Sequence, residues 1–160
     1  MSVVVLLLCA GLSEAVGRIL PLLAGRPGMA RPLVAGLLLA AGLVEGTVFA
    51  LWPPTAWNLA ALVTSSPTAG EGLAWTPGLL APLLLAAVLA FPLLGPFLHL
   101  LLFVGVGATL ADPLATATGL GWWSAAGCVA LAGVGLGVAV ETVRRLVVRI
   151  NAPRATESIS

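Results

Sequence analysis

The chain has 160 residues, of which 60% are hydrophobic and only 8% are charged, whereas soluble domains carry roughly 25% charged residues. So few charges cannot cover the exterior of a water-soluble fold, so the apolar surface must face lipid. The net charge is +1 and all seven basic residues are arginines, which excludes the broad basic face that nucleic-acid binding requires. We therefore expect an all-α integral membrane protein whose partner is the lipid bilayer, with no nucleic acid bound.

Residue usage also indicates a source and a compartment. Alanine, glycine, proline and arginine, whose codons are GC-rich, abound, while lysine and tyrosine are absent. This usage is typical of a high-GC bacterium, so we expect the plasma (inner) membrane. Cys9 and Cys128 belong to no CxxC or Cys/His cluster, which predicts neither a metal site nor a redox motif. The apolar N-terminus lacks the positive region of a signal peptide, and we interpret it as the start of a retained helix.

Two apolar segments open the chain, at about 3–24 and 33–52, and each has near the ~20 residues needed to cross the hydrocarbon core. A stretch rich in Gly, Pro and Arg separates them. From 53 to 77 the composition becomes mixed, which predicts an extramembrane loop. Within this loop Thr55 could cap a short helix over 56–63 that lies among the lipid headgroups.

The next apolar run, 78–111, is too long for one crossing. Its 34 residues would make a helix of ~51 Å, well beyond a ~30 Å core. Two prolines and a glycine interrupt its middle: Pro92, Gly95 and Pro96. We therefore predict a helical hairpin with spans at 78–94 and 96–111 and a turn over 91–97.

The last span is predicted at 121–143, after a break at Asp112-Pro113. The chain then forms one transmembrane domain over 1–150, a bundle of about five helices, followed by a short polar tail over 151–160. The bundle has four crossings if 78–111 is not a hairpin.

Arginine distribution predicts the orientation of the spans, because loops rich in Arg stay cytoplasmic. Arg26 and Arg31 place the first loop inside, so the N-terminus lies outside. Five crossings then bring the C-terminal arginines to the cytoplasm: Arg144, Arg145, Arg149 and Arg154. All five tryptophans would lie at or near the outer interface, where Trp is enriched.

Four ionisable residues are candidates for an intramembrane polar site. Glu14 lies near the midpoint of the first span with Arg18 one turn later, and Glu45 lies slightly outward of the midpoint of the second. His99, in the cytoplasmic half of the fourth span, is the only histidine. A charge at the bilayer centre costs at least ~2.5 kcal/mol, so such side chains normally face a protein interior or a wet cavity. We predict that both acids point inward and that Glu14 lies within reach of Arg18 or Glu45.

These residues have a functional and a structural interpretation. They could form a proton or cation path in which one carboxylate titrates and Arg18 keeps the other ionised. Alternatively, Glu14 and Arg18 simply neutralise each other, while Glu45 is protonated or hydrogen-bonded between helices. His99 could relay protons or merely bond a neighbouring carbonyl.

Small residues recur on two helices as GxxxG patterns, at 42–46 and 133–137, and a small-residue stripe on the last helix comprises Ser124, Cys128 and Ala132. Such patterns allow close helix approach. They serve either packing within one subunit or association into a homo-oligomer or a larger membrane complex. Glu141 and Arg145, spaced i, i+4, are interpreted as an interfacial anchor.

No enzyme motif is present, neither HExxH, GxSxG nor a phosphate-binding loop, so catalysis and cofactors are not expected. The leading hypothesis is a small ion- or proton-coupled transporter or channel that uses the buried carboxylates. The alternative is a non-catalytic accessory or assembly subunit of a larger complex. A membrane enzyme acting on lipid ranks third, because His99 and the two acids lie at different depths.

Overall fold

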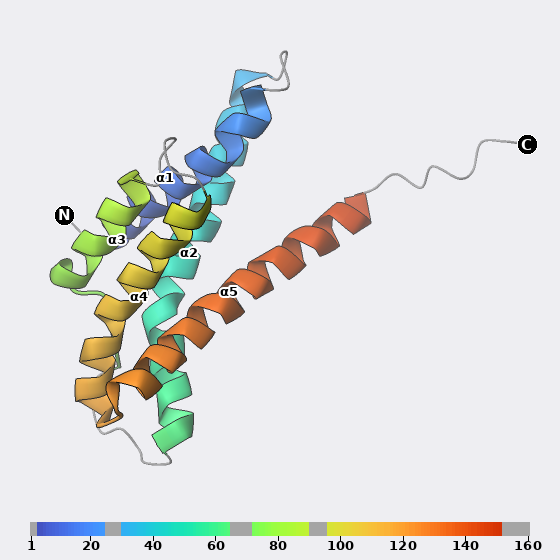
Figure 1. Ribbon diagram of the computed structural model, residues 1–160. Helices are drawn as coiled ribbons and strands as arrows, with labels where there is room; N and C mark the ends of the chain where they lie inside the picture. Colours follow the sequence, from blue (N-terminus) through green and yellow to red (C-terminus); the bar gives the residue numbers. More distant parts are fainter. Residues whose placement is uncertain (1–2, 25–29, 65–71, 90–95, 152–160) are drawn as a thin grey trace, which may run out of the picture.

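The computed structural model describes residues 3–24, 30–64, 72–89 and 96–151, and within them all regular secondary structure is α-helix (Figure 1). The five helices are α1 (Val3–Ala24), α2 (Arg31–Thr64), α3 (Pro77–Leu89), α4 (Pro96–Thr118) and α5 (Trp122–Asn151). The predicted all-α class is confirmed. Among the described residues, two segments are long and apolar enough to cross a membrane, all of α2 and Trp122–Leu146 of α5.

Successive helices run in opposite directions and form a closed ring (Figure 1). In ring order the helices are α1, α2, α5, α4 and α3, which returns to α1, and α2 also contacts α4 across the ring. The four fully buried leucines that the structure describes belong to α3 and α4: Leu80, Leu83, Leu110 and Leu114. The second half of α5 leaves the bundle as a projecting arm (Figure 1).

Helix α1 has the predicted bounds, but α2 does not end at residue 52. It continues through Pro53 and Pro54 to Thr64, so the predicted loop is wrong for its first part. Residues 72–76 are not helical, and residues 65–71 lie outside the described residues.

Helix α2 continues through Pro53 with the help of a side chain that bonds the carbonyl left without a helical donor by this proline. Pro53 has no N–H for the carbonyl of Phe49, four residues earlier. The indole of Trp75 donates to that oxygen instead, at 2.7 Å. Thr55 does not cap a new helix as predicted. Its hydroxyl donates to the carbonyl of Leu51 at 2.7 Å, which keeps it inside the continuous helix.

The long apolar run does divide into two helices, α3 and α4, which pack against each other. Helix α3 is described as far as Leu89, and residues 90–95, which hold the rest of the predicted span and most of the predicted turn, lie outside the described residues. Helix α4 runs through Pro113 to Thr118, so the predicted break at Asp112-Pro113 is wrong. The helix ends instead at Gly119, whose φ of 72° suits glycine and whose N–H bonds the carbonyl of Ala115 at 2.9 Å.

Candidate functional site

The first two helices cross at three glycines. A Cβ atom added at Gly11 would lie 2.7 Å from Cα of Gly46 and closer still to Gly46 N and Gly42 O. One at Gly42 would lie 3.0 Å from Cα of Leu12. The predicted close approach of the 42–46 pattern is thus confirmed, and its partner is α1 of the same chain. The contribution of Gly11 was not predicted, although it stands on the same helical face as Glu14.

Glu14 lies on this packed face of α1. The face repeats at helical spacing and is otherwise apolar, comprising Leu7, Ala10, Gly11 and Ala15. Glu14 is only 3% exposed, so its carboxyl points into the bundle as expected. It has an interaction partner, as do its neighbour Ser13 and Glu45 of α2. A carboxyl is therefore held where helix packing would otherwise select an alanine or a leucine.

The glycine crossing fixes where Glu45 stands relative to Glu14. Gly46 lies against Leu7 and Leu8, and Gly42 against Leu12, so the antiparallel register places Glu45 level with residue 9 of α1. That level is about five residues from Glu14, or ~8 Å along the helix axis. Glu45 is partly buried. Direct contact between the two carboxyls would therefore need both side chains to reach along the groove between α1 and α2.

For the other two predicted site residues, Arg18 and His99, the structure describes the backbone but not the side chain. Arg18 stands one turn beyond Glu14 on α1, so Glu14 lies between Arg18 and Glu45 along the axis. His99 stands in the first turn of α4, which in the described part of the chain contacts α2, α3 and α5 rather than α1. The side chains of Arg18 and His99 lie outside the described ones, so the predicted reach from Glu14 to Arg18 stays a prediction.

A second polar feature, at the junction of α2, α4 and α5, was not predicted. Trp52 is 7% exposed, and its indole donates to the carbonyl of Val129 at 2.8 Å. The ring lies against Gly133, where an added Cβ would sit 3.1 Å from it, and beside Phe103 with ring centroids 6.3 Å apart. Gly133 therefore makes room for an indole of the same chain.

Two tryptophans face the protein interior. Trp52 and Trp75, 7% and 8% exposed, donate to backbone carbonyls in the core, and the level of all five tryptophans relative to the membrane stays a prediction. Trp123 is 84% exposed and could serve at an interface. Hydropathy could not separate the buried from the exposed tryptophans, because the carbonyls that Trp52 and Trp75 bond, those of Val129 and Phe49, are distant from them in the sequence.

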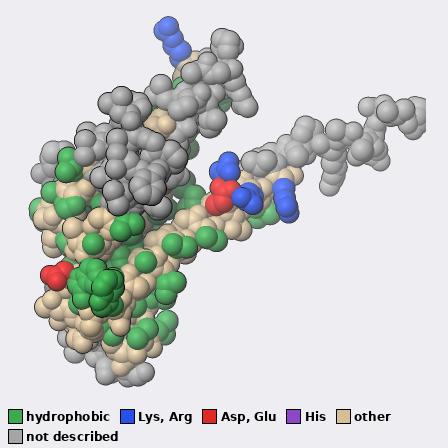
Figure 2. Space-filling view, in the orientation of Figure 1, with side chains coloured by type: hydrophobic (Ala, Val, Ile, Leu, Met, Phe, Trp, Pro, Cys, Tyr) green, Lys and Arg blue, Asp and Glu red, His purple; other side chains and the backbone are tan. Residues whose placement is uncertain are grey.

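The C-terminal half of α5 carries the one charged cluster with described geometry. The carboxylate of Glu141 accepts from Nε and Nη2 of Arg144, at 2.7 and 2.9 Å, and from Nε of Arg145 at 2.7 Å. The predicted pairing of Glu141 with Arg145 is confirmed, and Arg144 is a second partner. Figure 2 shows this cluster on the projecting arm, beyond the apolar part of α5.

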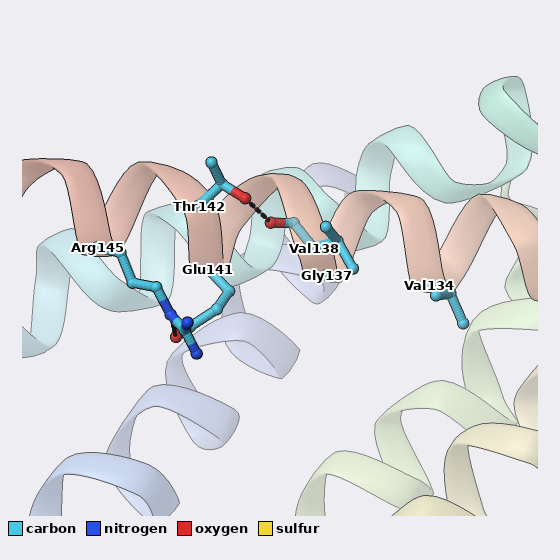
Figure 3. A pocket seen from close by; sticks show the side chains of 6 residues that line it. All are labelled: Val134, Gly137, Val138, Glu141, Thr142 and Arg145. Atoms are coloured by element: carbon cyan, nitrogen blue, oxygen red, sulfur yellow. Dashed lines mark hydrogen bonds and ion pairs between the residues drawn. The ribbon is translucent and has the colours of Figure 1, made fainter.

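A hollow of about 460 Å³ runs along the arm toward this cluster (Figure 3). Its described lining comes from α5: Val134, Gly137, Val138, Glu141, Thr142 and Arg145. Neither Glu14 nor Glu45, the two candidates with described side chains, belongs to it. Ser124 of the predicted small-residue stripe is exposed, whereas Cys128 and Ala132 are buried against the bundle. Comparisons with family models, curated proteins and solved structures find no match for this chain.

Proposed function

We propose that the chain is a polytopic membrane protein that crosses the bilayer five times and uses Glu14 and Glu45 as a proton or cation site. Membrane embedding is supported by two long apolar helices and by large aliphatic side chains exposed along the bundle, among them Leu39, Leu43, Leu131 and Val134, each more than 60% exposed. The alternating helix directions (Figure 1) bring the Arg31 end of α2 and the arginine end of α5 to the same half of the bundle.

The topology has a direct test. We expect the N-terminus outside and the C-terminus in the cytoplasm, because Arg31 and the α5 arginines then lie on the side that retains basic residues. A phosphatase fusion, active outside, and a fluorescent-protein fusion, active inside, should report opposite sides for the two termini. Equal reports from both termini would contradict an odd number of crossings.

The observation that carries the site is the burial of Glu14. Glu14 is 3% exposed on an otherwise apolar helix face. Placing such a carboxyl within a membrane span costs free energy, so these residues usually have a partner or a function. Glu45 lies ~8 Å further along the axis, so a proton would pass between the carboxyls when both side chains reach along the groove or when a water molecule bridges them. We therefore propose a protonation-coupled path between α1 and the helices beside it.

We expect Glu14→Gln and Glu45→Gln to abolish flux in proteoliposomes while the protein still folds, because glutamine keeps the volume and loses the titratable proton. Flux would be measured with a pH-sensitive dye inside the vesicles under an imposed gradient of H⁺, Na⁺ or K⁺. Asp112→Asn is the matched control, because Asp112 is an exposed acid on α4. It should leave both flux and melting temperature unchanged.

The close glycine crossing favours a second candidate, a non-catalytic subunit of a larger membrane complex. Helices α1 and α2 approach closely at Gly11. The two carboxyls could then act only in holding the packed helices together, without conducting a proton or cation. This candidate predicts wild-type flux no greater than that of empty vesicles. It also predicts that Glu14→Gln lowers the melting temperature, since a buried, partnered carboxyl is then lost.

A further inference from the structure

We propose that the hollow on the α5 arm binds an anionic phospholipid, with its acyl chain along Val134 and Val138 and its phosphate at Arg145. The inference rests on the proposed membrane embedding. The hollow of about 460 Å³ is open along one face of α5, which suits an acyl chain lying along the helix rather than an enclosed ligand. Its lining changes along α5 from apolar to charged, in the order that a lipid changes from chain to headgroup.

The length of α5 places this change at a membrane interface. Trp122 and Arg144 are 22 residues apart, or ~33 Å along the helix, close to the ~30 Å thickness of the hydrocarbon core. The exposed Trp123 at one end suits the headgroup level. The arginines then reach the opposite headgroup level, and Val134 and Val138, 65% and 59% exposed, lie at the depth of acyl chains.

Charge complementarity selects an anionic headgroup. Three arginines and one glutamate give the last turns of α5 a net charge of +2: Arg144, Arg145, Arg149 and Glu141. The carboxylate of Glu141 accepts a hydrogen bond from Nε of Arg145. Among the described hydrogen bonds, it accepts none from the two Nη groups of Arg145. Guanidinium groups bind phosphate in a bidentate manner. Glu141 thus acts as a positioning residue, holding Arg145 with its outer edge toward the lipid.

The test uses the full chain purified in a non-ionic detergent and titrated with phosphatidylglycerol or phosphatidylcholine of the same acyl chains. Native mass spectrometry counts the lipid retained per chain. We expect preferential retention of phosphatidylglycerol, and about fivefold weaker binding in Arg145→Gln, equivalent to ~1 kcal/mol. Arg31→Gln removes an exposed arginine of α2, away from the hollow, and should leave binding unchanged.

Two further variants separate an oriented site from diffuse attraction. Glu141→Gln raises the net charge by one, so diffuse attraction predicts tighter binding, whereas a positioned Arg145 predicts weaker binding. Val138→Trp fills the hollow and should reduce retention of the lipid. Weaker binding in both supports the inference. Equal losses in Arg31→Gln and Arg145→Gln, or equal retention of both lipids, would overturn it.

The remaining outcomes identify a different occupant. Full competition by soluble glycerol phosphate, with no effect of Val138→Trp, would indicate a phosphate site that needs no acyl chain. A change in oligomeric state in Val138→Trp, with lipid retention intact, would indicate a second copy on this face. Either result overturns the inference.

Alkaline carbonate extraction separates a failure of the lipid-site inference from a failure of the proposed function. A chain released into the aqueous phase by this treatment would refute membrane embedding itself.

Discussion

Replacing Gly11 with leucine is expected to prevent α1 and α2 from packing and to cause the largest loss of stability of any single substitution in α1. Even a Cβ at this position would lie 2.7 Å from Cα of Gly46, and the opposing atoms are backbone, which cannot rotate away. We expect a loss of about 3 kcal/mol or more, at the upper end of overpacking effects. Reversible unfolding in mixed micelles would measure it.

The matched control is Gly36→Leu in α2, where an added Cβ would meet nothing within 4 Å. Leucine is a better helix former than glycine by up to ~1 kcal/mol, so this change should be neutral or stabilising. The alanine variants should follow the same order, with Gly11→Ala destabilised and Gly36→Ala not. Equal stability of Gly11→Leu and Gly36→Leu would show that the crossing does not hold the bundle together.

Hydropathy and helix breakers predicted the number and order of the helices, because apolar runs and glycine or proline clusters mark their cores and ends. The bounds of α1 follow directly from its apolar run. The errors lie at prolines inside helices, where Pro53 and Pro113 were interpreted as breaks. Pro53 does not end α2, because the indole of Trp75 bonds the carbonyl that this proline leaves without a helical donor, and a partner so distant in the sequence is not visible in the local pattern.

The candidate site, too, was only partly predictable from the sequence. An acid in an apolar helix must face the protein interior, and Glu14 does. The close approach at Gly42 and Gly46 was predicted from spacing, but Gly11 was not, because a lone glycine in a chain with 19 of them carries no signal by itself. Gly137 of the second pattern meets nothing within 4 Å, which shows that spacing alone does not select the glycines that are used.

Trp75→Phe is expected to destabilise the protein by about 2 kcal/mol, because it leaves the Phe49 carbonyl buried without a donor. Trp52→Phe should cost less, although the two indole bonds are similar in length, 2.7 and 2.8 Å. The carbonyl of Val129 retains the N–H of Gly133 as its helical donor, whereas Pro53 offers none to Phe49. Trp123→Phe, at a position 84% exposed, should be neutral.

A double-mutant cycle with Pro53→Ala separates the loss of the hydrogen bond from Trp75 to the Phe49 carbonyl from the loss of the indole's volume. Alanine at position 53 restores a backbone N–H that can bond Phe49, so Trp75→Phe should cost at least ~1 kcal/mol less in that background than in the wild type. Trp52→Phe should cost the same in both backgrounds. If Trp75→Phe were equally costly with and without Pro53, its indole would stabilise the bundle through packing alone, and α2 would tolerate its prolines for some other reason.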